Sequence, residues 1–173
     1  QKSADDYIPG GCAVTAAFGS SPSSQTYKIQ YKGNGTYTGA IKQARIIAIK
    51  LTANDQTASS TGRVTYSTDT TWQDKVSKTF TATAGDYLII ASAVMDHAYN
   101  TYPAKAQINV DGSAQYGSSS VYVNKTDNRF GYLYFQKVSL TAASHTVKLQ
   151  YATGSAGRAV GIASAYLTIL ALS

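Results

Sequence analysis

Hydrophobic and polar residues alternate with a period of two along much of the chain. Near the N-terminus, Tyr27, Ile29 and Tyr31 fall on one face of such a pattern, and lysine and glutamine residues fall on the other. A half-buried strand has this period, whereas an amphipathic helix repeats every 3.6 residues. The segment Ala44–Leu51 is almost continuously apolar, which is typical of a strand covered on both faces. The chain therefore predicts strands.

The same two patterns predict further strands, separated by turns rich in glycine, aspartate and serine. The predicted strands are Cys12–Phe18, Thr26–Lys32, Ala44–Leu51, Arg63–Ser67, Val76–Ala82, Asp86–Met95, Ala104–Val110, Ser120–Asn124, Phe130–Val138, His145–Ala152, Arg158–Ala163 and Ala165–Leu172. Many short strands without helical periodicity indicate two packed sheets. The predicted fold class is all-β, a single β-sandwich or jelly-roll domain.

The end of the chain repeats its beginning. Residues 25–31 align with 145–151, and after a one-residue shift 44–51 align with 165–172. We therefore divide the sequence into an N-terminal arm, a half repeat, a polar linker and a full repeat unit, at residues 1–11, 12–51, 52–62 and 63–173. Residues 12–51 are expected to superpose on residues 132–172 as strand–turn–strand units.

An incomplete repeat has a consequence for assembly. A half repeat cannot bury its own apolar face, and stacked repeats bury such faces against a neighbour. Ahead of it, Pro9 and the two glycines that follow resist regular pairing. We expect the arm to contact a neighbouring subunit, with Tyr7 and Ile8 as its apolar anchors.

Composition supports the all-β prediction and limits the classes of binding partner that we expect. The nine acidic residues are all aspartate, tyrosine occurs 14 times, and the net charge is +6. Glutamate favours helices, whereas tyrosine, threonine and valine suit pleated surfaces. The basic residues are scattered, and a nucleic-acid footprint needs a concentrated patch. Nucleic acid is therefore not an expected partner, whereas an acidic glycan or envelope surface stays open.

The first residue of the chain and two candidate glycosylation sequons favour a secreted protein. The longest apolar stretch, Ala159–Leu172, is shorter than the roughly 20 residues a spanning helix needs, so no membrane span is expected. The chain begins at Gln1, for which a removed signal peptide and a trimmed expression product are the two explanations. Asn34 and Asn124 start candidate N-glycosylation sequons. The single cysteine, Cys12, is either a buried small residue or an intermolecular crosslink. The expected location is extracellular or on the cell surface.

Catalytic and metal-binding patterns are weak. His97 follows a predicted strand and His145 begins one, and the two histidines are far apart in the sequence. No nucleophile motif accompanies them, and the absence of glutamate leaves no carboxylate pair to nominate. The prediction is a protein that is not an enzyme and has no cofactor. Calcium stays open without an assigned site, because turn residues offer oxygen atoms at Asp5, Asp6, Asp111, Asp127 and Asn128.

Aromatic residues are the best binding candidates. Tyrosines on predicted loops suit sugar rings or protein interfaces, and they are Tyr99, Tyr102, Tyr116 and Tyr122. In the strand that begins at Phe130, Tyr132 and Tyr134 alternate with Leu133 and Phe135, so neither face is polar. This pattern indicates either a central strand or a buried interface, and core packing is the expectation.

A resemblance covers about two thirds of the chain, residues 61–173. Its strand-and-turn phrases are Trp72–Lys75, Ala84–Ala93, Val110–Gly112 and Ala143–Tyr151. In this order they resemble the jelly-roll modules of secreted microbial surface proteins and phage structural proteins. The resemblance implies a structural, adhesive or glycan-binding role and carries over no functional residue.

Three functions follow from these observations. The first is a secreted structural subunit that self-assembles by strand or arm exchange into a filament, tube, sheath or surface layer. The second is a carbohydrate-binding or adhesive module. The third is a viral decoration or fibre protein, to which the same assembly argument applies.

Overall fold

The computed structural model describes residues 28–30, 46–49, 51–66, 70–97, 102–115, 119–122 and 130–172. Contacts within the chain define a smaller unit, residues 16–52, and a larger unit formed by residues 1–15 and 53–173. All ten strands of the described residues lie in the larger unit, which we call the sandwich.

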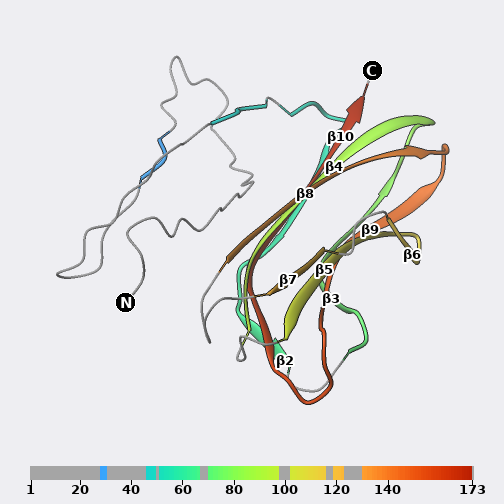
Figure 1. Ribbon diagram of the computed structural model, residues 1–173. Coiled ribbons are helices and arrows are strands. Elements are labelled where there is room, and N and C mark those ends of the chain that lie inside the picture. Colours follow the sequence, from blue (N-terminus) through green and yellow to red (C-terminus); the bar gives the residue numbers. More distant parts are fainter. Residues whose placement is uncertain are drawn as a thin grey trace. The chain divides into compact units, whose positions relative to one another are not determined.

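The sandwich consists of two antiparallel sheets that face each other (Figure 1). The first sheet has β10 and β4 at its centre and β8 at one edge, with β1 and β2 both paired to the other side of β10. The second sheet runs β3, β9, β5, with β6 and β7 both paired to the far side of β5. The strands of the first sheet are β1 (Gln56–Ser60), β2 (Val64–Tyr66), β4 (Gly85–His97), β8 (Phe130–Leu140) and β10 (Val160–Leu172). Those of the second are β3 (Gln73–Thr81), β5 (Pro103–Val110), β6 (Ser113–Ala114), β7 (Ser119–Tyr122) and β9 (Ser144–Thr153).

The core lies between the two sheets and follows from the period of two. Every second residue of the long strands points inward, and the inner residues of both sheets form one hydrophobic cluster. Its most deeply buried aliphatic members include Ile89, Leu167 and Ile169 from the first sheet and Val147 and Leu149 from the second. Burial of one such side chain stabilises the fold by about 2 kcal/mol.

The all-β sandwich prediction is confirmed, and two local predictions are wrong. Residues 56–60 were expected to belong to a polar linker, but they form β1 and pair with β10 from Gln56–Ile169 to Ser60–Ala165. This strand has one inward apolar residue, Ala58, packed against the core. Its hydrophobic pattern is therefore too weak to predict a strand. The expected break near Ser164 is a register shift inside β10, since a bulge fits extra residues without ending a strand.

The half repeat does not form the expected strands where it is described. Residues 28–30, 46–49 and 51 are not in strands, although strands were predicted across them. Their sequence counterparts lie in β9 and β10, which belong to different sheets. A strand needs a neighbour to complete its ladder, and a sequence pattern does not supply one. Predicted strand Cys12–Phe18 and the arm, residues 1–11, lie outside the described residues.

Candidate functional site

The outer face of the first sheet is apolar, although it points away from the core. Its outward residues occupy alternate positions and are mainly Leu88, Ile90 and Val94 of β4, Leu133 and Phe135 of β8, and Leu170 and Leu172 of β10. Within the described sandwich, the large hydrophobic residues that count as exposed all lie on this face: Leu133 at 37%, Leu172 at 42% and Phe135 at 56%. We call this surface the apolar face.

The strand register joins these residues into one strip. Phe135 lies opposite Ile90, which in turn lies opposite Thr168 of β10. One step along the sheet, Leu88 lies opposite Leu170. Side chains directly opposite on neighbouring strands are about 5 Å apart and contact one another. The apolar face therefore extends from the edge strand β8 to the central strand β10, with Lys137, Ser92 and Thr168 as polar positions within it.

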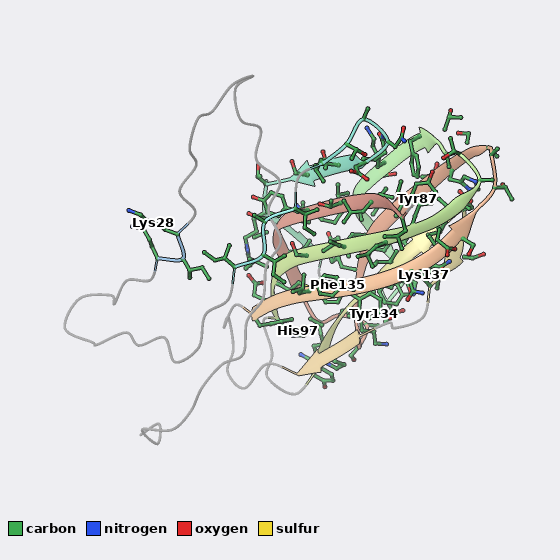
Figure 2. All side chains as sticks on the ribbon, turned by 90° about the horizontal axis from the view of Figure 1, so that it is seen from above. Lys28, Tyr87, His97, Tyr134, Phe135 and Lys137 are labelled. Carbon is green, nitrogen blue, oxygen red and sulfur yellow. The ribbon has the colours of Figure 1, made fainter. Side chains whose placement is uncertain are left out.

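A charged group borders this strip on β8. Lys137, two residues after Phe135, forms an ion pair with Asp86 at 2.7 Å, and the Ser139 hydroxyl donates to the same carboxylate at 2.5 Å. The hydrogen bond from Lys137 lowers the pKa of Asp86. Figure 2 shows Phe135 and Lys137 along β8. An apolar centre with a polar rim is the usual composition of a protein–protein interface.

β8 is also an edge strand. In the described part of the chain it pairs only with β4, and no described strand lies on its other side. The alternation of Tyr132 and Tyr134 with Leu133 and Phe135 was expected to reflect core packing. The structure buries only one set: Tyr132 belongs to the core and Tyr134 packs against it, whereas Leu133 and Phe135 face outward. An exposed hydrophobic edge is a template for pairing with another strand.

The outer face of the second sheet is built from polar side chains instead. Asp74 of β3 accepts hydrogen bonds from Lys148 and Gln150 of β9, both at 2.7 Å. Gln107 of β5 donates to Gln150 at 2.9 Å, which extends the chain of bonds across the sheet. We call this surface the polar face. Its side chains therefore bond one another across three strands.

One end of the sandwich holds a cavity of about 510 Å³, lined mainly by polar residues of the β5–β6 turn, the end of β8 and the start of β9, together with Val110, Val138 and Leu140. At its wall His145 Nδ1 lies 2.6 Å from Asp111 Oδ2, and the Thr146 backbone N–H donates to the other carboxylate oxygen at 2.7 Å. The hydrogen bond with Asp111 raises the pKa of His145, and the same bond lowers the pKa of Asp111. His145 was expected to be an ordinary surface residue, and sequence offered no signal for this pair.

Thr141 adds a third group beside this pair. Its hydroxyl lies 3.4 Å from His145 Nε2, which gives the order hydroxyl, imidazole, carboxylate seen in nucleophile triads. The Thr141 carbonyl oxygen is closer to Nε2, at 3.1 Å. The Asp111 carboxylate and the Thr141 carbonyl are both acceptors, so each ring nitrogen of His145 faces an acceptor. Because Nε2 lies closer to this carbonyl than to the Thr141 hydroxyl, the geometry favours a structural role.

The other histidine is part of the packing at the opposite end. His97 is fully buried, and its Nε2 lies 3.2 Å from the Thr153 hydroxyl. The preceding residue, Asp96, is held by Arg63 at 3.0 Å. A Cβ atom on Gly161 would collide with the Asp96 carboxylate, so the glycine makes room for this ion pair.

Tyr102 is the one tyrosine of the proposed contact set whose side chain is described. Its ring centroid lies 6.4 Å from that of His97, and the Arg158 guanidinium lies 5.1 Å above it. The ring is therefore engaged within the protein. Tyr122 belongs to β7. The remaining candidate residues lie outside the described part: Tyr7, Ile8, Cys12, Asn34, Tyr99, Tyr116 and Asn124, and the calcium candidates Asp5, Asp6, Asp127 and Asn128.

Metal and membrane features were sought in the same residues. Where the chain is described, no three histidine, cysteine or acidic residues come together as metal ligands. The described residues also include no helix with the length and hydrophobicity needed to cross a membrane. Compared with family models and with curated proteins, the chain matches none.

Proposed function

We propose that the chain is a non-enzymatic, secreted structural subunit that self-assembles into an extracellular filament, tube, sheath or surface layer. The observation that carries this proposal is the apolar face, where Leu133 and Phe135 are exposed on β8, an edge strand among the described strands, and Leu172 is exposed on β10. A solvated edge strand normally carries charges or proline to prevent pairing, and β8 has one such charge, Lys137, next to its exposed apolar residues. Leucine and phenylalanine at such positions favour a contact that covers them.

The proposal includes a jelly-roll topology for the sandwich, and the pairing pattern supports it. The chain pairs with itself like one long hairpin, in which β1 meets β10, β3 meets β9, β4 meets β8 and β5 meets β7. Counting β1 with β2 and β6 with β7 as interrupted strands leaves the eight strands of a jelly roll. Such double-sheet folds occur in viral capsid proteins and lectins, which agrees with a structural or binding role.

The test compares one charge on each face. Phe135→Lys places a lysine on β8 at the edge of the apolar face, and Thr81→Lys places one at an exposed outward position on β3, the edge of the polar face. We expect the wild type and Thr81→Lys to assemble alike, and Phe135→Lys to remain a monomer. Light scattering and negative-stain imaging measure the assemblies, and circular dichroism checks the fold. A wild type that stays monomeric at all concentrations, or equal assembly of all three proteins, contradicts the proposal.

The cavity at Asp111 and His145 favours a second candidate, a carbohydrate-binding module. Hydroxyl and charged groups that line it, including Ser113, Ser139 and Thr141, suit the hydroxyl groups of a sugar. Binding to a glycan array that Asp111→Ala abolishes would support this candidate. Equal binding by the two proteins, or no binding by the wild type, would rule out a glycan at this cavity.

Assembly on a viral particle, the third candidate, uses the same apolar face. Imaging of the native source separates it from a filament or surface layer, because a decoration protein occurs on capsids and a filament subunit does not.

A further inference from the structure

The turn between β5 and β6 holds the one Asp-Gly sequence of the chain, Asp111–Gly112. Val110 and Ser113 pair across it, so the turn has two residues. The φ angles of Asp111 and Gly112 are 51° and 85°, and a two-residue hairpin turn of type I′ needs positive φ at both positions. Among the described residues, Asp111 is the one residue other than glycine with positive φ. The hairpin therefore depends on the backbone of these two residues.

An aspartate followed by glycine can rearrange its own backbone. The glycine nitrogen attacks the side-chain carboxyl carbon of the aspartate, a C–N bond forms, and the amide hydrogen and the carboxyl OH leave as water. The product is a succinimide, which a water molecule opens at either carbonyl carbon. Opening at the side-chain carbon restores aspartate, and opening at the backbone carbon gives isoaspartate. The sequence loses and regains one water without an oxidant, and glycine allows the close approach because it has no side chain.

Both reacting groups of this turn are engaged in hydrogen bonds. The Gly112 N–H donates to the side-chain oxygen of Asn109 at 3.0 Å. The Asp111 carboxylate accepts a hydrogen bond from the Thr146 N–H at 2.7 Å, and its other oxygen lies 2.6 Å from His145 Nδ1. The attacking nitrogen and the carboxyl group are thus each held by another residue. Formation of the succinimide requires that these bonds break.

Two further features of Asp111 affect the reaction. Its own N–H donates to the Thr146 carbonyl oxygen at 3.0 Å, which fixes the backbone of the turn to β9. The hydrogen bond with His145 lowers the pKa of Asp111, and an ionised carboxylate is a poorer target for attack than the protonated acid. The Asp111 side chain is nevertheless 45% exposed, so water reaches it. The fold therefore restrains the first step and leaves the site open to hydrolysis.

We propose that Asp111–Gly112 is an isoaspartate-forming site of this protein. In the folded chain, hydrogen bonds with Asn109, Thr146 and His145 hold the reaction back. Isoaspartate lengthens the backbone of the two-residue turn, and its free carboxylate is attached directly to Cα. We expect the modified residue to lose its contact with His145 and to change the wall of the cavity. The inference stands apart from the proposed function, because no step in it involves assembly.

Incubation of the full chain tests this site. The wild type is kept folded or unfolded in urea at about pH 6, where His145 is protonated because its pKa is raised. Folded Asn109→Ala and His145→Ala are incubated in parallel. Lys148→Ala is the matched control, since it removes from β9 a hydrogen bond to a different aspartate, Asp74. Circular dichroism checks the fold. Isoaspartate at each position is measured by mass spectrometry with electron-transfer fragmentation.

We expect isoaspartate at Asp111 to accumulate about fivefold faster in Asn109→Ala and in His145→Ala than in the folded wild type, and faster still in the unfolded chain. Lys148→Ala should match the wild type. Asp86 is an internal control, because tyrosine follows it and hinders attack. Absence of isoaspartate at Asp111 in the unfolded chain would refute the site. Equal rates in the folded and unfolded wild type, or in the wild type and both turn variants, would refute the restraint by the fold.

Discussion

The two outer faces of the sandwich have the same antiparallel geometry and opposite chemistry. On the polar face, Lys148 and Gln150 both donate to the Asp74 carboxylate within one chain. On the apolar face, Leu133 and Phe135 keep 37% and 56% of their surface exposed within one chain. The difference teaches that the polar face satisfies its side chains through hydrogen bonds along the sheet, whereas the apolar face leaves large hydrophobic side chains exposed, which is why we propose it as the assembly surface.

The largest expected effect concerns the ion pair between Arg63 and Asp96, which lies beside Gly161. In Gly161→Ala the new Cβ collides with the Asp96 carboxylate and displaces it from Arg63. We expect a loss of about 2–3 kcal/mol in the free energy of unfolding, measured by urea denaturation. Gly62→Ala is the matched control, because nothing lies near its added Cβ. Equal stabilities of the two variants would show that this ion pair is not held as described.

Much of the architecture could be predicted from sequence, because alternation is a local property. The strands that became β4, β5, β8 and β9 were found from their pattern with only small changes at their ends. β1 was missed because its stability comes from pairing with β10, and its sequence is polar. Residues 44–51 were expected to be a strand for their composition, yet the described residues 46–49 are not in a strand. In both cases the neighbouring strand decides whether the segment forms a strand. The hydrophobic pattern of the segment itself carries no information about that neighbour.

The candidate site was only half predictable. Sequence showed that Leu133 and Phe135 leave β8 without a polar face, and it left a central strand and an interface open. Only the strand order places β8 at an edge and so favours the interface. The pair of Asp111 and His145 was invisible, because the β5–β6 turn brings together residues that are distant in sequence.

A pair of variants sharpens the comparison at moderate effect. Asp74→Ala removes an acceptor that Lys148 and Gln150 share, so we expect it to lower the free energy of unfolding by about 1 kcal/mol. Phe135→Ala removes a larger side chain that is mostly exposed, and we expect nearly unchanged stability of the monomer with weaker assembly. Urea denaturation of dilute protein and light scattering of concentrated protein measure the two properties. The reverse assignment, in which Phe135→Ala unfolds more easily than Asp74→Ala, would contradict the division between the faces.

The smallest expected effect depends on pH and concerns the pair of Asp111 and His145 at the wall of the cavity. The pKa of His145 is raised above about 6.5 and that of Asp111 is lowered below about 3.9 by their contact. The stabilisation by His145 is complete below about pH 6.5 and is lost as the pH rises through the pKa of His145 in the folded protein. The stabilisation by Asp111 is lost as the pH falls through the lowered pKa of Asp111 in the folded protein. Asp111→Asn should therefore lower the melting temperature by about 1–2 °C near pH 5.5 and by less near pH 9. A difference that grows toward pH 9 would show that the ring and carboxylate do not form this pair.

Hydrogen exchange compares the two sheet edges most directly. Backbone amides of β8 (Phe130–Leu140) and of β3 (Gln73–Thr81) are measured by mass spectrometry in dilute monomer and in the assembly. If the apolar face and the β8 edge form the contact, exchange in β8 slows by about tenfold or more on assembly, because new main-chain hydrogen bonds protect its amides. Exchange in β3 stays the same. Protection of β3 with no change in β8 would contradict the central claim that the first sheet is the assembly surface.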